Sequence, residues 1–209
     1  MGALLDQVVI QRLDWDTEWF GFPIATVMGA GTGPLPTHEF RCLYCLCEPD
    51  HARWAEGEGF ELIDIRVELD WQGTREAPTG IREEMGERDR LQELARDAFA
   101  DSRFYQDERF PRERVDAMFG RWLERSSVVL TDDDRRGFIT YDHGHIGLVG
   151  VSAEARGAGL GVQLVNAAQA RNPSLTVVTQ GKNIAAQRLY QKCGFRTSAV
   201  KLWYHRWSS

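Results

Sequence analysis

Regularly spaced glycines form the most distinctive stretch of the sequence, Arg156-Gly-Ala-Gly-Leu-Gly161. This stretch follows the valine-rich run His145–Val151 and precedes the amphipathic run Val162–Arg171, an order that predicts a strand, a tight loop and a helix. Glycines let backbone N–H groups approach one anion, the helix N-terminus adds partial positive charge, and Arg156 adds a full charge. We therefore interpret the loop as a binding site for a diphosphate. The alternative is a glycine turn that only connects the strand to the helix.

A second stretch with polar residues at a helical spacing lies between Val177 and Phe195. It contains Asn183 and Tyr190, which are separated by close to two helical turns, so both side chains can face the same groove. The phenol of Tyr190 could donate a proton to a leaving group. The alternative for Tyr190 is packing in the core, with its hydroxyl bound to a carbonyl group.

The two stretches together resemble the GNAT superfamily of N-acetyltransferases. The glycine loop matches the Arg-x-x-Gly-x-Gly signature of that superfamily at every fixed position, whereas it lacks the Gly-Lys-Ser/Thr of a Walker loop. The resemblance implies an α/β fold in which helices flank a mixed, splayed sheet. It also implies acetyl-CoA as the acyl donor, with the pantetheine arm lying along Val149–Val151 like an extra strand. The residues that the resemblance assigns to acetyl-CoA are Val149, Gly150, Val151, Arg156, Gly157, Ala158, Gly159, Leu160, Gly161, Asn183 and Ala186.

Acyl transfer from a thioester needs no metal, because an uncharged amine attacks a thioester readily. Catalysis then requires alignment, stabilisation of the oxyanion and a proton for the departing thiolate, and Tyr190 is the candidate acid. The general base is not assigned. The titratable candidates each have an alternative as a solvated or packed side chain, and they are Glu154, His143, His145 and His205.

A wider resemblance, which runs through most of the chain, indicates the acceptor. The sequence is similar to TDP-fucosamine acetyltransferase-type sugar-nucleotide N-acyltransferases, which implies a nucleotide-linked amino sugar of the TDP-4-amino-4,6-dideoxyhexose type. This resemblance places Arg103 and Phe104 on the acceptor side, with Arg103 as a cation for the diphosphate; a surface salt bridge is the alternative for Arg103. The stretches that carry the resemblance are Leu13–Gly21, Gly59–Ile63, Ala98–Phe104, the helix through Trp122, and Thr179-Gln180.

Two other functions stay open at this point. One is an acetyltransferase for protein N-termini or for a small amine such as a polyamine, which would need an acidic pocket. The other is a non-catalytic acyl-CoA-binding domain. Asn183 and Tyr190 argue against the latter, because a domain that only binds acyl-CoA needs no proton donor.

The composition limits the classes of partner and the cellular compartment that we expect for this protein. The 209 residues carry a net charge of −6, which opposes the phosphate contacts that nucleic-acid binding requires. No apolar run is long enough to span a bilayer, and the N-terminus has no basic region before an apolar stretch, so we expect a cytoplasmic protein without a membrane partner. The final aromatic run, Leu202–Trp207, could pair across a two-fold axis to form a homodimer.

Three of the four cysteines lie in one short apolar run that predicts a strand, Cys42–Cys47. Side chains alternate along a strand, so Cys45 and Cys47 face one way and Cys42 the other. No second ligand pair completes a tetrahedral site. We therefore expect buried, reduced thiols and no metal site.

The turn-rich segment Gln72–Gly80 divides the chain into two predicted parts, residues 1–77 and residues 78–209. A gap-free offset of 135 residues aligns Phe40–Trp71 with Leu175–Arg206, strand on strand and helix on helix. We interpret the first part as a smaller, degenerate relative of the second, which alone binds the acyl donor. In the second part, helices are expected over 88–99 and 111–125, and strands over 127–130, 137–141 and 145–151.

Overall fold

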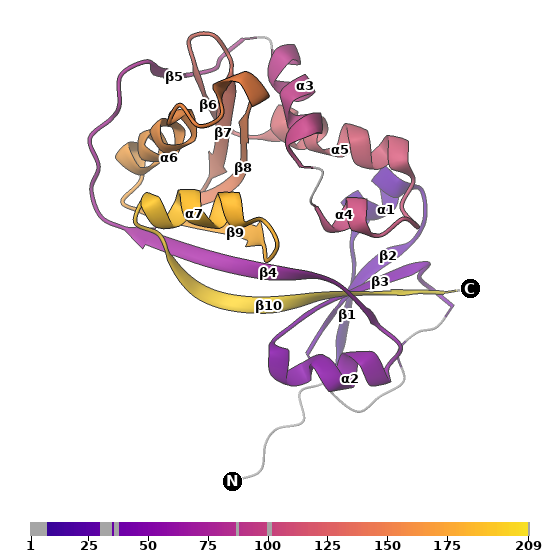
Figure 1. The fold of residues 1–209 in the computed structure, drawn as a ribbon. Helices are drawn as coiled ribbons and strands as arrows, with labels where there is room; N and C mark the ends of the chain where they lie inside the picture. The colour runs from indigo at the N-terminus through magenta and orange to yellow at the C-terminus, as the bar shows by residue number, and fades with distance from the viewer. Residues whose placement is uncertain (1–7, 30–34, 36–37, 87, 100–101, 209) are drawn as a thin grey trace.

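The structure, a computed structural model, describes residues 8–29, 35, 38–86, 88–99 and 102–208. Within these residues the strands form one mixed sheet with helices on both faces, which confirms the predicted α/β fold class (Figure 1). The strands are β1 (Val9–Arg12), β2 (Ile24–Met28), β3 (Cys42–Cys47), β4 (Glu61–Gln72), β5 (Ile81–Glu83), β6 (Val128–Asp132), β7 (Gly137–Asp142), β8 (His145–Val151), β9 (Ser174–Gln180) and β10 (Arg196–Trp207). The α-helices are α1 (Asp14–Phe20), α2 (Ala52–Gly57), α3 (Asp89–Ala98), α4 (Arg103–Gln106), α5 (Arg112–Arg125), α6 (Leu160–Arg171) and α7 (Ile184–Lys192), and two 3-10 helices are η1 (Pro49–His51) and η2 (Ala153–Ala155).

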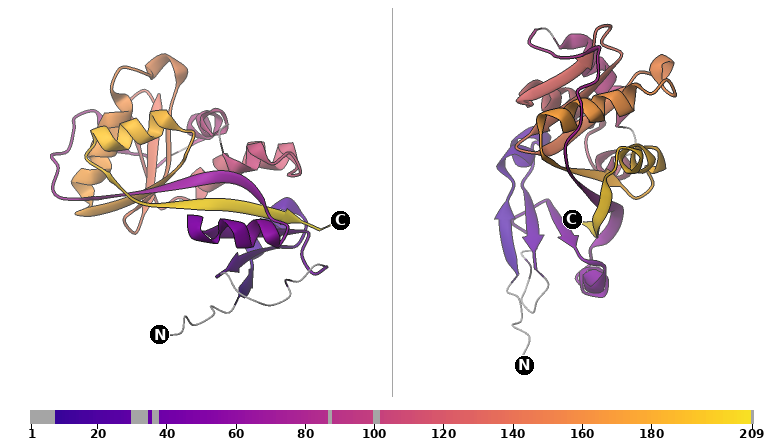
Figure 2. Two further views of the ribbon diagram at one scale, coloured as in Figure 1. Left: turned by 60° about the horizontal axis from the view of Figure 1, so that its bottom comes forward. Right: turned by 90° about the vertical axis from the view of Figure 1, so that its left-hand side faces the viewer.

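The order of the strands across the sheet is β1-β2-β3-β10-β4-β9-β8-β7-β6-β5. The neighbours β2–β3 and β8–β9 run parallel, and the other neighbours run antiparallel. Strand β4 lies between β10 and β9, and β10 lies between β3 and β4 (Figures 1 and 2). The N-terminal and C-terminal parts of the chain therefore share one sheet, because each contributes a long strand to the other.

The element order β3–α2–β4 repeats as β9–α7–β10. Strands β4 and β10 both contain 12 residues, and their first residues, Glu61 and Arg196, stand at the offset found in the sequence. The exchanged strands are thus the equivalent strands of the two halves. The division of the chain at residues 77 and 78 stays a prediction.

Alternating side chains on the strands fill separate cores on the two faces of the sheet. On β6 and β7, Leu130 and Ile139 pack with α6 and α7, whereas Val129 and Phe138 pack with α3 and α5. The helices and strands expected between residues 88 and 151 lie within two residues of their expected bounds.

A third core joins β2, β3, β10 and α2, and it contains Cys45 and Cys47. Cys42 packs in the core on the opposite face, as the alternation along the strand predicted. All three thiols are buried and free of disulfides. Burial raises the pKa of Cys45 to about 12, so this side chain behaves as an apolar group at neutral pH.

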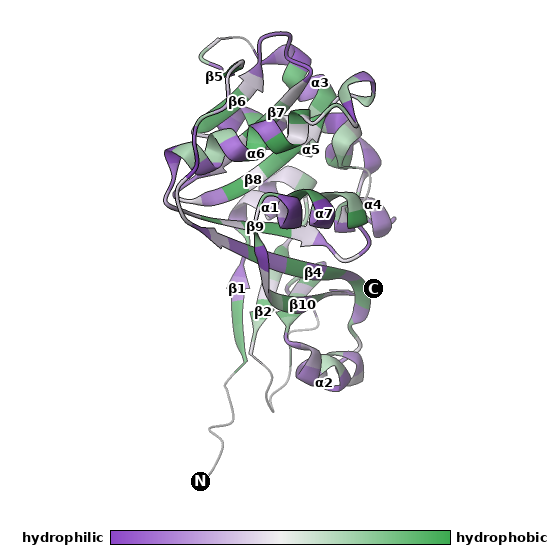
Figure 3. Ribbon diagram, turned by 60° about the vertical axis from the view of Figure 1, so that its left-hand side comes forward, coloured by the Kyte–Doolittle hydropathy of each residue, from purple (hydrophilic) through white to green (hydrophobic). Residues whose placement is uncertain are grey.

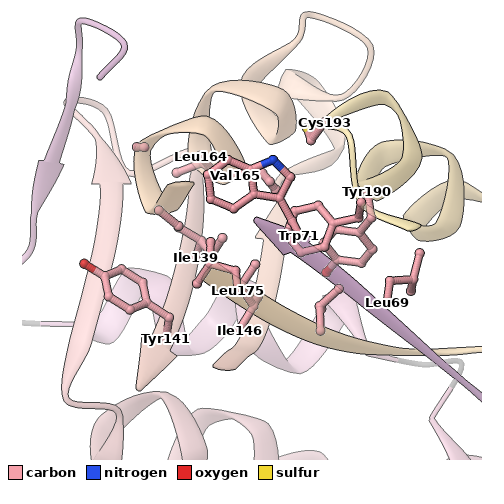
Figure 4. Close-up of a cluster of buried hydrophobic side chains, with 14 of the residues drawn as sticks. Leu69, Trp71, Ile139, Tyr141, Ile146, Leu164, Val165, Leu175, Tyr190 and Cys193 are labelled. Carbon is pink, nitrogen blue, oxygen red and sulfur yellow. The ribbon is translucent and has the colours of Figure 1, made fainter. Parts of the chain in front are cut away.

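The C-terminal half of β4 enters the core beneath α7. Leu69 and Trp71 of β4 lie beside Tyr190 in this core (Figure 4). Hydrophobic and hydrophilic residues alternate along β4 (Figure 3), so its opposite face is free to carry polar groups. Strand β4 therefore supports α7 from below with one face and presents polar residues on the other.

Candidate active site

The two central parallel strands separate after a short paired segment. Strand β8 pairs with β9 only at His145–Thr176 and Ile146–Val177. Beyond this point β8 continues alongside β7 as far as Val151, and β9 continues alongside β4 as far as Gln180. An opening therefore forms between β8 and β9, as the resemblance to splayed sheets implied, and the β9-facing edge of β8 carries backbone groups that β9 does not pair.

A cavity of about 250 Å³ occupies this region. Its walls come from β4, β8, β9, β10, α3, α4, α5 and α7, so both halves of the chain contribute. Six residues named from the sequence line it, namely Val149, Asn183, Ala186, Tyr190, Arg103 and Phe104. The structure thus brings three of the candidate donor-side residues, Val149, Asn183 and Ala186, to one space with both candidate acceptor-side residues.

Helix α7 positions Asn183 and Tyr190 at the cavity. Asn183 is the N-cap of α7, and its side-chain oxygen accepts a hydrogen bond from the backbone N–H of Ala186 at 3.0 Å. Tyr190 packs against Phe195 with ring centroids 5.6 Å apart, and its hydroxyl makes no hydrogen bond within the described residues. Burial raises the pKa of Tyr190 above its ordinary value, so the phenol keeps its proton at neutral pH.

The glycine loop lies outside the cavity, at the start of α6. Gly157 and Gly159 adopt left-handed backbone angles, with φ of +79° and +88°, and a Cβ atom at either position would meet no atom within 4 Å. Gly159 is the N-cap of α6, whose first N–H groups have no partner within the helix. Arg156 donates from Nε to the carbonyl of Val151 at 3.1 Å. Open space in front of free N–H groups is the geometry that a diphosphate requires.

Two other glycines of the predicted donor site differ in how closely their neighbours approach. A Cβ atom on Gly161 would lie 3.4 Å from Leu189, which is an ordinary van der Waals contact. A Cβ atom on Gly150 would lie 2.5 Å from the ring of Phe138, which is fully buried. Gly150 therefore has a structural reason to be glycine that is independent of any ligand.

Arg103 lies at the acceptor side of the cavity. Its guanidinium carbon is 4.5 Å from the ring centre of Tyr44, 3.9 Å from that of Phe104 and 4.3 Å from that of Trp203. Its Nη1 lies 3.2 Å from Nε2 of His205. Within the described residues Arg103 forms no ion pair with a carboxylate, so the alternative of a surface salt bridge does not describe this side chain.

His205 and Asp107 form a buried pair next to Arg103. His205 Nδ1 lies 2.7 Å from Asp107 Oδ2, and both side chains are almost completely buried. Burial lowers the pKa of His205 to about 4, and the charge of Arg103 acts in the same direction, whereas the hydrogen bond to Asp107 opposes the shift. Burial alone would raise the pKa of Asp107, but hydrogen bonds from His205, Arg109 and Trp207 lower it below its ordinary value.

None of the four general-base candidates lines the cavity. His205 has both ring nitrogens engaged, so it cannot accept a proton from a substrate. His145 contacts Thr176 at the closed end of the β8–β9 pair, and His143 and Glu154 are exposed. The carboxylate that does line the cavity is Asp64 of β4.

Sequence reasoning missed several further residues of the cavity wall. Asp64 and Arg66 come from β4, and Trp203 comes from β10. The alternating pattern of β4 indicated which of its residues share a face. Because β4 was placed in the first half of the chain, however, nothing in the sequence connected that face with the cavity.

Much of this site lies in a region whose sequence matches a known protein family. The model described as "Acetyltransferase (GNAT) family" matches residues 89–195, just over half of the chain. The chain belongs to this family. The matched part of the GNAT chain runs from α3 to the end of α7 and contains the glycine loop, Asn183 and Tyr190.

Individual relatives are distant. The GNAT chain is 26% identical over 141 residues to the spore coat polysaccharide biosynthesis protein SpsD of Bacillus subtilis (strain 168), covering 59% of this chain and 49% of that protein. It therefore spans about half the length of this curated relative. A functionally unknown conserved protein from Staphylococcus epidermidis ATCC 12228 has a similar structure, with TM-score 0.61 and 12% identity over 100% of this chain and 94% of that chain. A tandem GNAT protein from the clavulanic acid biosynthesis pathway has TM-score 0.55 and 14% identity over 90% of this chain and 76% of that chain.

The described part of the chain contains neither a candidate metal centre nor a helix that could span a membrane. No group of three or more His, Cys, Asp or Glu side chains there could hold a metal ion. None of the helices there combines the length and the apolar character needed to cross a bilayer.

We predict that His205 makes the protein less stable in mild acid. Its folded pKa of about 4 lies below its ordinary value of 6.5, so the unfolded chain binds the proton more readily, and stability is lost as the pH falls from about 6.5 to 4. One such group contributes up to about 1.4 kcal/mol for each pH unit in this window. Urea unfolding at several pH values measures this slope.

The control for this prediction is His205→Asn, which has no titrating ring. Its stability at pH 7 is lower because a buried contact is lost, but its slope between pH 6.5 and 4 should be shallower than that of the wild type. Equal slopes in the two proteins would show that His205 does not resist protonation in the folded state.

Proposed function

We propose that this protein transfers an acetyl group from acetyl-CoA to the amine of an amino sugar, with a nucleotide-linked 4-amino-4,6-dideoxyhexose of the TDP type as the acceptor class. The observation that carries the proposal is the single cavity between the splayed strands, which Tyr190 and Asn183 reach from one side and Arg103 from the other. The family match supports acyl transfer, and the name of the relative SpsD, a polysaccharide biosynthesis protein, supports a sugar-related acceptor.

The donor side fits acetyl-CoA in two places. The open left-handed glycines and the start of α6 fit its diphosphate, with Arg156 to Gly161 as the binding loop. The edge of β8 that β9 leaves unpaired includes Val149, which lines the cavity together with Asn183 and Ala186, and we assign the amide-bearing arm to this edge along Val149–Val151. The thioester would then lie near Tyr190.

The reaction needs few protein groups. The amine nitrogen attacks the thioester carbon, the C–S bond breaks, and the departing sulfur takes a proton from the phenol of Tyr190, whose raised pKa keeps it protonated until then. The amine loses a proton as the amide forms. Asp64, the carboxylate that lines the cavity, is the group that we assign to accept this proton.

The charges of the cavity separate the acceptor classes. Among the described residues its lining carries two guanidinium groups, Arg66 and Arg103, and one carboxylate, Asp64. Arg66 forms an ion pair with Glu68 at 2.7 Å, whereas Arg103 forms none within the described residues. A polyamine or a basic peptide N-terminus would require an excess of negatively charged side chains in the cavity. An acceptor with a phosphate is instead attracted to a guanidinium group. A domain that only binds acyl-CoA would have no use for Tyr190 at the cavity.

The remaining parts of the proposal concern the whole chain. Residues 1–77 act as a degenerate GNAT-like lobe whose role is to supply β4 to the cavity wall, and a tandem GNAT protein among the structural neighbours supports this interpretation. Free, buried cysteines fit a reducing compartment, so we assign the protein to the cytoplasm.

The experiment that tests the proposal is a panel of amines offered with acetyl-CoA, with release of free CoA as the measurement. TDP-linked amino sugars should give the highest kcat/KM, followed by unphosphorylated amino sugars. Peptides with free N-termini and polyamines should react slowly or not at all. A preference for a peptide or a polyamine would replace the proposed acceptor, and no reaction with any amine would favour a binding domain.

We predict that Tyr190→Phe lowers kcat by about two orders of magnitude, with little change in KM. The substitution keeps the ring and its packing but removes the proton that the thiolate receives. The matched control is Tyr141→Phe, because Tyr141 is a buried tyrosine of the same core that does not line the cavity (Figure 4). If Tyr190→Phe turns over at the wild-type rate under conditions where chemistry limits the rate, Tyr190 is not the general acid.

We predict that Gly159→Ala weakens binding of CoA by about tenfold, since the new methyl group occupies the space in front of the N–H groups. The variant also loses stability, by about 1–3 kcal/mol, because alanine is strained at a left-handed φ. Gly80→Ala is the matched control, since Gly80 has a φ of +76°, the same open surroundings and a position in the turn before β5. Calorimetric titration with CoA should distinguish the two variants. Equal affinities would show that the diphosphate does not bind at this loop.

A further inference from the structure

A chain of buried contacts fixes the guanidinium of Arg103. Arg103 begins α4, and its guanidinium lies against the rings of Tyr44, Phe104 and Trp203, each within 4.5 Å of the guanidinium carbon. These rings come from β3, α4 and β10, so three separate elements confine one side chain. The contact with His205, 3.2 Å from Nη1, sets the rotation of the guanidinium within this enclosure.

The protons in the series of contacts Arg103–His205–Asp107 can be placed because Arg103 is only a donor. A guanidinium can only donate, so Nε2 of His205 accepts the hydrogen bond from Arg103. Nδ1 of His205 therefore carries the ring proton and donates it to Asp107 at 2.7 Å. Asp107 also accepts from Trp207 Nε1 at 2.9 Å and from both Nε and Nη2 of Arg109. His205 is thus held as one neutral tautomer.

Among the residues that the structure describes, no carboxylate lies within ion-pair distance of Arg103. The negative charge of Asp107 is matched by Arg109, which forms two hydrogen bonds with it. Asp16 interacts with Arg103 from beyond ion-pair distance, and its carboxylate lies 3.4 Å from the hydroxyl of Tyr44. A half-buried cation that lines a cavity, with N–H donors beyond those given to the uncharged side chains of His205 and Tyr44, is suited to bind an anion in that cavity.

We propose that the Asp107–His205 pair is a positioning device that holds Arg103 as the recognition group for an anionic oxygen group of the acceptor. Asp107 and His205 act through Arg103 and touch no substrate themselves. The inference rests on the proposed function, since it takes the cavity to be the acceptor site. It adds a specificity rule, namely that the enzyme selects amines that carry a phosphate or a carboxylate.

Both ends of the pair are needed for this role. A neutral imidazole accepts from Arg103 without competing for its charge, whereas a carboxylate in the place of His205 would neutralise the guanidinium. Asp107 in turn selects the Nδ1–H tautomer, which is the form with a free acceptor at Nε2. The buried carboxylate therefore orients Arg103 from a distance and leaves its charge available to a ligand.

The kinetic test compares three acceptors that differ in charge: an amino sugar with a nucleoside diphosphate, an amino sugar with a carboxylate, and the uncharged amino sugar. Arg103→Met should raise KM for the preferred anionic acceptor by about tenfold to a hundredfold, with kcat and the KM for acetyl-CoA nearly unchanged. The uncharged amino sugar should show no change in KM. The matched control is Arg112→Met, because Arg112 also stacks on a ring, that of Tyr105 at 4.9 Å, but does not line the cavity.

Variants of the pair separate positioning from general structure. His205→Phe should raise the same KM as Arg103→Met, and His205→Gln, whose amide can both accept from Arg103 and donate to Asp107, should recover part of the loss. A folded His205→Phe protein with wild-type KM for the anionic acceptor would overturn the proposal. If His205→Phe does not fold, the wild-type protein still decides, since nitrogen NMR of His205 must show the neutral Nδ1–H tautomer, and an Nε2–H tautomer would overturn it.

A binding measurement keeps this inference apart from the proposed function. With CoA present in excess, a nucleoside diphosphate without an amine should bind the wild type and bind Arg103→Met at least tenfold more weakly. Equal binding to both proteins would overturn the role of Arg103 even if an amine is acetylated. Failure of every amine to react would instead remove the proposed function, while the loss of diphosphate binding in Arg103→Met would still support the anion site.

Discussion

The position of strand β4 between β10 and β9 is the constraint on which the site depends. The register pairs seven residues of β4 with β9 and, on its other edge, runs along β10 from Asp70 to Glu61. Through these pairings β4 holds Trp71 and Leu69 in the core under α7 and holds Asp64 and Arg66 at the cavity. A shift of one residue would exchange these two faces, so the packing of α7 and the chemistry of the cavity wall are set together.

The cavity wall and the buried pair behind Arg103 contain groups whose protonation states are fixed by different physical causes. Tyr190 keeps its proton because its surroundings are apolar, and His205 stays neutral because it is buried and lies beside a guanidinium. Asp107 keeps its charge because three donors surround it. The result is a space with a neutral proton donor near one wall and a fixed positive charge near another, and neither depends on titration near neutral pH.

Local patterns predicted the parts of the site that are continuous in sequence. The loop before α6 was recognised because glycines have a specific role at helix starts, and the structure places them there. Asn183 was named for its spacing from Tyr190 and for the family resemblance, and its role as the cap of α7 was not predicted. The role of Gly150 in packing was not predicted, since it depends on Phe138 from another element. Asp64 and Trp203 were missed for the same reason, because strand pairing between distant parts of the chain brings them to the cavity. The offset of 135 residues indicated which strands of the two parts of the chain correspond. That correspondence does not show that β4 inserts next to β9, or β10 next to β3.

The interleaved strands also govern the order in which the molecule can assemble. Strand β10 follows the other nine in the chain, yet it separates β3 from β4 in the finished sheet, and the residues that it pairs with lie 126 to 165 residues earlier. Until β10 has been synthesised, β3 and β4 each present an unpaired edge, and contacts of such long range form slowly because a large loop must close first. The first half of the protein therefore cannot reach its final structure on the ribosome ahead of the second, so the two halves fold as one cooperative unit. Strand edges that stay exposed until β10 is synthesised are sites where chains can pair with each other. Correct folding therefore also depends on the rate of synthesis and on the local protein concentration.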